Sequence, residues 1–318
     1  MTAGAAETLR LLHMTDVHFF RPRGLKGAFG KRALGLANLY IKGRRHYFDP
    51  DRVVPVAVDD ALRHSPDLFC HTGDVTALSA PEEFVAARAA FAPLLDSVPS
   101  VVVPGNHDVY TRGAERTARM EETFAPFMAG GTWDDDAGRW VGASPLGGGP
   151  VPWPSRFRLG FVDVIATNPC RPGLQASGRF APGAIARAEE LVRESRAAGQ
   201  VVVYMTHYPV LEPEGAVYDH AGHALLDVQQ LVESLRRAPP DLLLHGHEHQ
   251  AFRQTLQGEG RDTLVLGCGT TSAVTSLRPR AAGYFLVELG RDGVRSVRRR
   301  VRDPETGAFD DDPDLSDD

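Results

Sequence analysis

Short apolar runs alternate along this chain with longer stretches in which apolar residues recur at helical spacing. Runs rich in Leu and β-branched residues predict buried strands at 9–15, 67–72, 100–104, 161–167, 200–206, 241–245, 263–266 and 284–289. Helical spacing, in several cases opened by Pro or Asp, predicts helices at 53–64, 81–96, 114–128, 182–198 and 224–237. Regular alternation of strand and helix is typical of the α/β class.

Two regions fall outside this alternation. The stretch 133–154 is rich in Gly and Pro and is predicted to form a long loop, because strand patterning resumes directly after it. The final residues 304–318 hold many aspartates and few apolar side chains, a composition that does not offset the entropy lost on ordering. We therefore expect one domain over residues 1–303, followed by a disordered acidic tail.

The composition is that of an ordinary globular protein and argues against several classes of function. The 318 residues are 42% hydrophobic and 24% charged, and the formal net charge is -6. Nucleic acid is disfavoured as a partner, because the chain lacks the positive field that general nucleic-acid binders use. No apolar run approaches the roughly 20 residues of a membrane-spanning helix. Three widely spaced cysteines and an N-terminus without a signal-peptide pattern predict a cytoplasmic protein with reduced thiols.

Polar motifs follow five of the predicted strands. In chain order they are Asp16-Val17-His18, Gly73-Asp74, Gly105-Asn106-His107-Asp108, His207 and Gly246-His247-Glu248-His249. Sites in α/β sheets form at the carboxyl ends of strands, so we expect all five motifs to converge on one site. Any single member could instead be a turn former or a buried polar group. The ordered set is much more specific, since Gly-Asn-His-Asp alone is expected by chance on the order of 0.001 times in such a chain.

In this order the motifs resemble those of the calcineurin-like metallophosphoesterases, over residues 9 to 289. Their short forms also resemble the class III cyclic-nucleotide phosphodiesterase branch of that superfamily. The resemblance implies a four-layer α/β/β/α sandwich, in which two mixed β-sheets pack face to face and are flanked by helices. It places the site at one end of the sandwich.

The resemblance also implies a role for each motif residue. Asp74 would bridge two divalent metal ions, and six further ligands would complete the site: Asp16, His18 and His249 on one ion, and Asn106, His207 and His247 on the other. Oxygen and imidazole ligands without thiolate suit Mn²⁺ or Fe²⁺, with Zn²⁺ as an alternative. His107 would donate a proton to the leaving oxygen, and Asp108 would orient and charge it.

A phosphoester is the substrate class that this chemistry implies. In two-metal sites the ions lie roughly 3.5 to 4 Å apart and share a hydroxide that attacks phosphorus in line. Two divalent ions, two carboxylates and one hydroxide leave a single positive charge, which a phosphodiester monoanion would neutralise. We therefore expect a small phosphodiester, such as a 3',5'-cyclic nucleotide. The alternatives are a nucleotide-linked or phospholipid-precursor substrate at a membrane surface, and a catalytically silent binding scaffold, which has no need of the full ligand set.

The stretch 21–52 is strongly basic, with nine Lys or Arg residues against two Asp. It begins three residues after His18, so it must start beside the site. Two interpretations remain open: an amphipathic surface helix packed on the domain, or a cap that binds an anionic substrate or an anionic membrane surface. In the second interpretation Lys31 and Arg32 would contact the substrate. Further candidates for lining the site adjoin the motifs: His71, Tyr110 and Tyr208.

Overall fold

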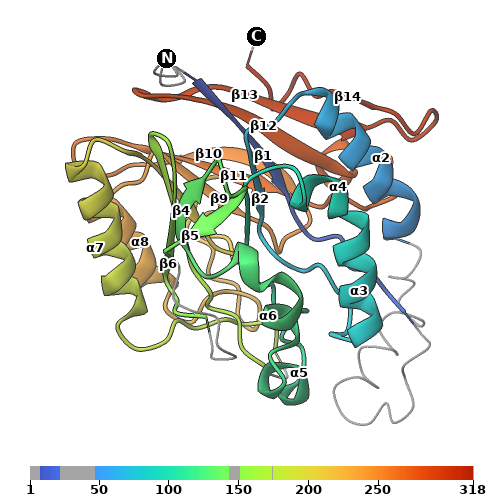
Figure 1. Ribbon diagram of the computed structural model, residues 1–318, viewed down its shortest axis with the longest axis horizontal. Helices are drawn as coiled ribbons and strands as arrows, with labels where there is room; N and C mark the ends of the chain where they lie inside the picture. The colour runs from blue at the N-terminus through green and yellow to red at the C-terminus, as the bar shows by residue number, and fades with distance from the viewer. Residues whose placement is uncertain (1–7, 22–46, 143–150, 174, 318) are drawn as a thin grey trace.

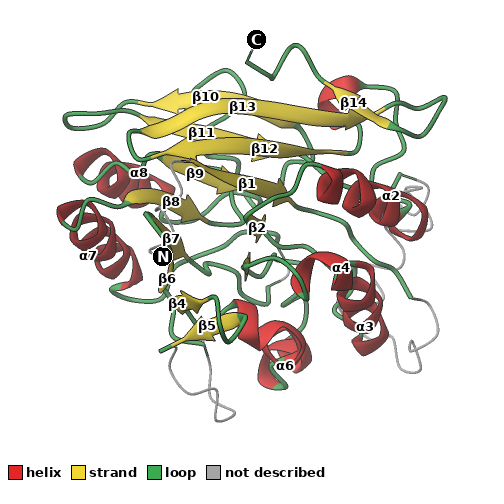
Figure 2. Cartoon of the chain, turned by 45° about the horizontal axis from the view of Figure 1, so that its top comes forward, coloured by secondary structure: helices red, strands yellow, loops and turns green. Residues whose placement is uncertain are grey.

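Two mixed β-sheets pack face to face, and helices cover the outer face of each sheet (Figure 1). The structure is a computed structural model that describes residues 8–21, 47–142, 151–173 and 175–317. The view in Figure 2 shows the layers in order, with α7 and α8 on one side and α2 to α4 on the other. The predicted four-layer α/β/β/α sandwich is therefore confirmed. Within the described ranges, no helix combines the length and apolarity that crossing a bilayer requires.

The first sheet has the strand order β14-β13-β12-β1-β2-β3. Its strands are β1 (Thr8–Met14), β2 (Leu68–His71), β3 (Ser100–Val102), β12 (Gly283–Gly290), β13 (Gly293–Arg302) and β14 (Phe309–Asp311). Strands β1, β2 and β3 run parallel, whereas β12, β13 and β14 add antiparallel neighbours beyond β1. The carboxyl ends of β1, β2 and β3 consequently meet at one edge of the sheet.

The second sheet has the order β10-β11-β9-β8-β7-β6-β4-β5. Its strands are β4 (Gly131–Asp134), β5 (Arg139–Val141), β6 (Ser155–Leu159), β7 (Val162–Ala166), β8 (Val201–Met205), β9 (Leu242–His245), β10 (Ala251–Leu256) and β11 (Thr263–Cys268). Strands β7, β8, β9 and β11 are parallel. Their carboxyl ends form a second edge at which polar residues gather.

Three apolar layers hold the sandwich together. Along β1 the side chains alternate: Leu12 and Met14 face helices α2 (Pro50–Arg63), α3 (Pro81–Ala90) and α4 (Ala92–Leu95), while Leu9 and Leu11 face the second sheet. The third layer joins the second sheet to α7 (Ala184–Ala197) and α8 (Val228–Arg237). Two short helices, α5 (Arg112–Arg116) and α6 (Arg119–Phe124), and two 3₁₀ turns, η2 (Ala125–Phe127) and η3 (Arg278–Arg280), complete the elements.

The expectation of a disordered tail over 304–318 is wrong for the residues that the structure describes. Phe309–Asp311 pairs with β13 as strand β14, and Asp312 forms an ion pair with the fully buried Arg299. Asp317 accepts a hydrogen bond from the backbone N–H of Val297. Strand β13 is rich in arginine, so the acidic residues are attracted to it and are not left solvated. Composition alone does not reveal such a partner strand.

Other boundaries also differ from the sequence expectations. The predicted loop 133–154 contains part of a hairpin, β4 and β5, in which the rings of Trp133 and Trp140 pack edge to face at 5.2 Å. The predicted helix 114–128 is broken into α5, α6 and η2, with Ala118 in the left-handed region at φ 46°. The predicted helix 81–96 is divided at Phe91 into α3 and α4.

A buried carboxylate joins α2 to the first sheet and gives a test of the fold. Asp60 accepts hydrogen bonds from the Tyr284 hydroxyl at 2.5 Å and from Arg300 Nε at 3.1 Å. Burial opposes its ionisation, but the hydrogen bonds to Arg300, Tyr284 and Arg63 outweigh burial and lower the pKa of Asp60.

We expect Asp60→Asn to reduce the free energy of unfolding at pH 7 by roughly 2 to 4 kcal/mol, because charged hydrogen bonds between buried groups are lost. A lowered pKa stabilises the fold above the unfolded-state pKa of about 4, and that stabilisation is lost as the pH falls through the folded-state value. The difference between variant and wild type should therefore shrink in acid. Urea denaturation at pH 7 and pH 3.5 measures it. The neighbouring exposed Asp59→Asn is the control, and an equal effect of both variants would contradict the assignment.

Candidate metal centre

The five polar motifs lie at the carboxyl ends of β1, β2 and β3 in one sheet and of β8 and β9 in the other. The first two loops run side by side, because the Asp16 N–H donates to the Gly73 carbonyl at 3.0 Å. A hydrogen bond of 2.8 Å from His207 Nδ1 to the Thr72 carbonyl joins the second sheet to the first. The two edges therefore meet, and residues far apart in sequence share one site, as the sequence predicts.

Five of the seven expected ligands have a left-handed backbone, which is uncommon for residues other than glycine. Their φ angles are 53° for Asp16, 53° for His18, 56° for Asp74, 77° for His247 and 51° for His249. Such conformations are strained and persist only where the surrounding structure enforces them, most often at functional sites. The strands thus end in turns that direct these side chains to a common centre.

Two glycines allow the loops to approach the carboxylates closely. A Cβ on Gly105 would lie 2.1 Å from Asp74 Oδ1, and a Cβ on Gly246 would lie 2.1 Å from Asp16 Oδ2. Any other residue at either position would push a carboxylate out of place. This explains why glycine precedes both the Asn-His and the His-x-His ligands.

A first group of ligand atoms comes from Asp16, His18, Asp74 and His249, all within 4.8 Å of one another. Asp16 Oδ1 lies 3.1 Å from His249 Nε2 and 3.6 Å from His18 Nε2. Its other oxygen accepts hydrogen bonds from the Thr15 hydroxyl at 2.6 Å and the His247 N–H at 3.0 Å, which fixes the carboxylate. Burial opposes ionisation of Asp16, but hydrogen bonds to His18 and His249 outweigh it and hold its pKa well below the usual range.

A second group of ligand atoms comes from Asn106, His207 and His247. The lone pairs of these three atoms point toward one another. His207 donates through Nδ1 to Thr72, and His247 Nε2 lies 3.0 Å from the His223 carbonyl, so the opposite nitrogens carry no proton. Those nitrogens lie 3.2 Å apart and 3.0 and 2.9 Å from Asn106 Oδ1. Burial lowers the pKa of both rings and keeps them neutral. Three converging acceptors without a proton between them are stabilised by a cation.

Asp74 lies between the two groups. Its Oδ2 is 3.9 Å from His18 Nε2, which belongs to the first group, and 3.5 Å from His207 Nε2, which belongs to the second. Its Oδ1 accepts a hydrogen bond of 2.7 Å from the His107 N–H. One carboxylate is therefore held by the backbone on one side and shared by both ligand groups on the other.

The donor set fits divalent metal ions. It consists of carboxylate and amide oxygens and imidazole nitrogens and contains no thiolate. Mn²⁺, Fe²⁺ and Zn²⁺ all bind ligand atoms of these kinds. The nearby Cys170 donates through Sγ to the Pro104 carbonyl at 3.2 Å, and burial raises its pKa well above the usual value.

The family match agrees with this geometry. The profile of the calcineurin-like phosphoesterases matches residues 9–251, which is most of the chain. The chain belongs to the calcineurin-like phosphoesterase family. The profile ends at the His-x-His loop after β9, so it covers every motif residue considered above.

Solved structures resemble this chain in fold. A dimetal phosphatase from Danio rerio superposes with a TM-score of 0.57 and 13% identity over 95% of this chain and 98% of that protein. A purple acid phosphatase from yellow lupin seeds superposes with a TM-score of 0.55 and 12% identity over 96% of this chain. A 5'-nucleotidase precursor from Thermus thermophilus superposes with a TM-score of 0.52 and 16% identity over 92% of this chain. The chain spans 53% and 54% of the last two. A search of curated sequences finds no match. The narrower resemblance to the cyclic-nucleotide branch stays a prediction.

His107 lies against the first ligand group, but Asp108 does not orient it. The rings of His107 and His18 are 5.0 Å apart, and His107 Nδ1 lies 2.7 Å from the Ala77 carbonyl. The carboxylate of Asp108 instead accepts hydrogen bonds from the N–H groups of Gly105, Val75 and Thr76 and from the Thr76 hydroxyl. The predicted role of Asp108 is therefore wrong: it holds the loop together. Burial raises its pKa to about 6, although these donors act in the opposite direction.

The candidate substrate contacts have different positions in the structure. Tyr110 stacks on His107 with ring centroids 5.3 Å apart, so it lies at the site. Tyr208 is fully buried against His247, with ring centroids 4.6 Å apart. His71 is 1% exposed and packs against Phe91, behind the ligands, and burial lowers its pKa to about 3. Lys31 and Arg32 lie outside the described residues.

Two contributions to the site were missed by sequence reasoning. Phe48 lies at the end of the basic stretch, and its ring is 4.5 Å from that of His18 and 5.1 Å from that of His249. The Ala77 carbonyl holds His107, but a backbone group leaves no mark in a sequence pattern. An aromatic residue near the end of the basic stretch is the signal available for Phe48.

The shared position of Asp74 leads to a graded prediction for metal content. Wild type should bind about two Mn²⁺ ions, Asp16→Asn about one, and Asp74→Asn fewer than one, because only Asp74 serves both groups. Elemental analysis after equilibrium dialysis measures this, with Asp59→Asn as the control that keeps the wild-type value. If Asp74→Asn loses no more metal than Asp16→Asn, the shared position is contradicted.

Proposed function

We propose that this protein hydrolyses a small phosphodiester at a binuclear divalent metal centre. The observation that carries the proposal is the position of Asp74 Oδ2 between a histidine of each ligand group. Asp16, His18 and His249 would hold one ion with Asp74, and Asn106, His207 and His247 the other. When bound, such ions stabilise negative charge on phosphoryl oxygens and lower the pKa of water. Mn²⁺ or Fe²⁺ suits the donor set best, with Zn²⁺ as the alternative.

His107 would act on the leaving oxygen of the ester. Since its Nδ1 is engaged with the Ala77 carbonyl, Nε2 is the nitrogen that would carry a proton to substrate. The stacked ring of Tyr110 holds the imidazole from one side. A backbone carbonyl and an aromatic face therefore both contact the ring.

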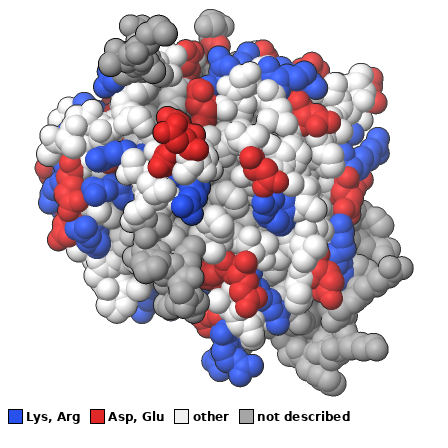
Figure 3. Space-filling view, viewed as in Figure 1, with Lys and Arg blue, Asp and Glu red and all other residues white. Residues whose placement is uncertain are grey.

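A diester is favoured over a monoester by the charge of the centre. With two divalent ions and one hydroxide bound, the carboxylates of Asp16 and Asp74 would leave a single positive charge, which a phosphodiester monoanion neutralises and a monoester dianion exceeds. A 3',5'-cyclic nucleotide fits this class. A nucleic acid does not suit the face drawn in Figure 3, over which positive and negative side chains of the described residues are interspersed. The three cysteines are free thiols, which supports the proposed cytoplasmic location.

The second candidate is a nucleotide-linked or phospholipid-precursor substrate at an anionic membrane surface. It is favoured by the two ends of the basic stretch, which meet beside the metal centre. Arg21 donates to Asp51 at 2.5 and 2.8 Å, and Phe48 lies against His18. The chain therefore leaves the site and returns to it, as a cap would require. A silent scaffold is disfavoured, since all seven ligand residues and His107 converge.

We expect His107→Asn to keep the wild-type metal content and to lower kcat by roughly 10² to 10⁴, the usual contribution of a general acid. Hydrolysis of bis(p-nitrophenyl) phosphate and metal analysis of the same preparation measure the two quantities. His64→Asn, at the end of α2 and far from the motifs, is the control. Loss of metal from the His107 variant would make this residue a ligand and contradict its role as a proton donor.

The proposed function itself is tested by a substrate panel assayed with Mn²⁺. It contains bis(p-nitrophenyl) phosphate, p-nitrophenyl phosphate, cyclic AMP and a lipid-linked diphosphate in anionic vesicles. We expect kcat/KM for the diester to exceed that for the monoester at least tenfold. The reverse order would contradict the diester preference, and a preference for the lipid-linked substrate would favour the second candidate. Absence of turnover with metal bound would contradict an enzyme.

A further inference from the structure

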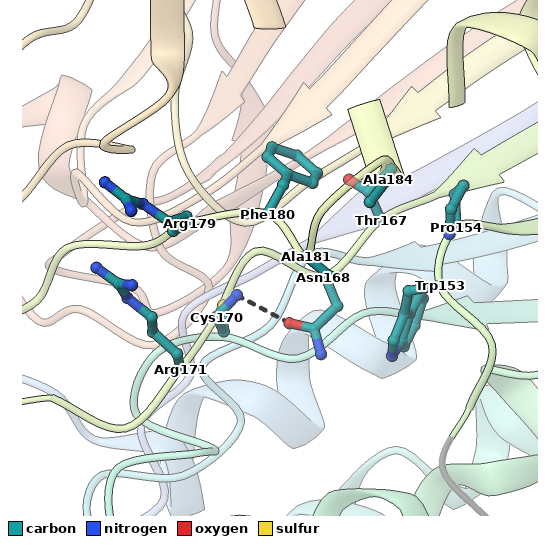
Figure 4. Close-up of a pocket in the computed structure, with 10 residues that line it drawn as sticks. All are labelled: Trp153, Pro154, Thr167, Asn168, Cys170, Arg171, Arg179, Phe180, Ala181 and Ala184. Atoms are coloured by element: carbon teal, nitrogen blue, oxygen red, sulfur yellow. Dashed lines mark hydrogen bonds between the residues drawn. The ribbon is translucent and has the colours of Figure 1, made fainter. Parts of the chain in front are cut away.

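A cavity of about 350 Å³ opens at the carboxyl end of β7 (Figure 4). Strand β7 is the parallel neighbour of β8, which ends just before His207. The Thr167 hydroxyl at the cavity donates to the Met205 carbonyl at 2.8 Å, two residues before that ligand. The cavity therefore lies one strand away from the second ligand group, at the same edge of the sheet.

A hydrogen bond and close packing link the wall of the cavity to the loops that carry the metal ligands. Cys170 in the wall is bonded to the carbonyl of Pro104, two residues before Asn106. Behind the wall, Gly178 packs so closely on Tyr208 that a Cβ would lie 2.5 Å from the tyrosine ring. The Tyr208 ring in turn lies against His247. Its hydroxyl is buried and has no hydrogen-bond partner among the described residues, which is uncommon in a native structure.

Positive charge gathers on one side of this cavity. Figure 4 shows the guanidinium groups of Arg171 and Arg179 extending in the same direction from the loop between β7 and α7. Neither group makes a hydrogen bond or ion pair with any residue in the described ranges. Ala184, the first residue of α7, and Ala181, which precedes the helix, also line the cavity, so the partial positive charge of that helix end adds to the arginines.

The remaining lining suits a flat group with polar edges. Trp153 and Phe180 contribute aromatic surface. Asn168 accepts a hydrogen bond from the Cys170 N–H through Oδ1 at 2.9 Å, which fixes the amide and leaves its NH₂ to donate to a ligand. Aromatic surface with a few convergent donors is the usual composition of a small-molecule site.

We propose that this cavity binds the organic part of the phosphoester and selects a flat group bearing a second negative charge, which Arg171 and Arg179 recognise. The proposal rests on the proposed function, because the cavity is assigned to the same substrate as the metal centre. It narrows that substrate to phosphodiesters with an anionic aromatic substituent, such as a nucleotide with a further phosphate. Two arginines recognise either a carboxylate or a phosphate, so a carboxylate is a valid probe.

The test uses two phosphodiesters that differ in one charge. The first is 4-nitrophenyl 4-carboxyphenyl phosphate, and the second is the same compound with its carboxylate converted to a methyl ester. With the Mn²⁺-loaded protein we expect kcat/KM to be about ten- to a hundredfold higher for the carboxylate, mainly through KM, since charge-assisted hydrogen bonds contribute to binding. The double variant Arg171→Gln, Arg179→Gln should lose this preference, so that its kcat/KM is similar for the two substrates. Arg193→Gln, on the exposed side of α7, is the matched control and should keep the preference.

Failure of the cavity and failure of the proposed function give different results. If wild type hydrolyses both substrates equally, or if the double variant keeps the preference, the cavity proposal is overturned and the phosphoesterase stands. If neither substrate is hydrolysed, the proposed function fails. Calorimetric binding of 4-carboxyphenyl phosphate to the Mn²⁺-loaded protein then decides on the cavity alone. Binding at least tenfold tighter to wild type than to the double variant supports it, and equal binding overturns it.

Discussion

The carboxylate of Asp74 is held where two groups of electron-rich atoms meet, and the architecture around it serves to keep it there. Imidazole nitrogens from both sheets approach the same oxygen, while the backbone of His107 holds the other. The lone pairs of these nitrogens and the negative charge of the carboxylate repel one another in a buried site unless a cation lies among them. The site is therefore electrostatically incomplete as a set of protein atoms alone.

The sandwich supplies the rigidity that this arrangement needs. Each ligand loop follows a strand whose side chains are buried on both faces, so the loop begins at a fixed point. Left-handed turns at five ligands and close approaches at Gly105 and Gly246 are tolerated because apolar layers on both sides of each sheet hold the strands. A cation bound here would stabilise the folded state as well as serve chemistry, since the unfolded chain offers no such cluster.

The α/β class and the convergence of the five motifs could be predicted from order and spacing, whereas the four-layer sandwich and the ligand set were implied by the resemblance to the calcineurin-like metallophosphoesterases. Parallel strands have their carboxyl ends at the same edge of a sheet. Motifs that directly follow such strands are therefore expected to lie close together. What could not be predicted depends on partners far away in the chain. The acidic tail is ordered by arginines of β13, and the Trp133–Trp140 hairpin lies within a stretch that Gly and Pro mark as a loop. The support of His107 comes from a carbonyl, whereas its neighbour Asp108 binds backbone N–H groups. The sequence pattern does not show whether Asp108 binds the neighbouring histidine or backbone N–H groups.

The most direct test of the shared position of Asp74 is a crystal structure of the Mn²⁺-loaded protein with anomalous diffraction recorded at the manganese edge. We expect two anomalous peaks in each molecule, one among Asp16, His18 and His249 and one among Asn106, His207 and His247. Both peaks should be in contact with the Asp74 carboxylate. A single peak, or two peaks of which only one contacts Asp74, would contradict the shared position.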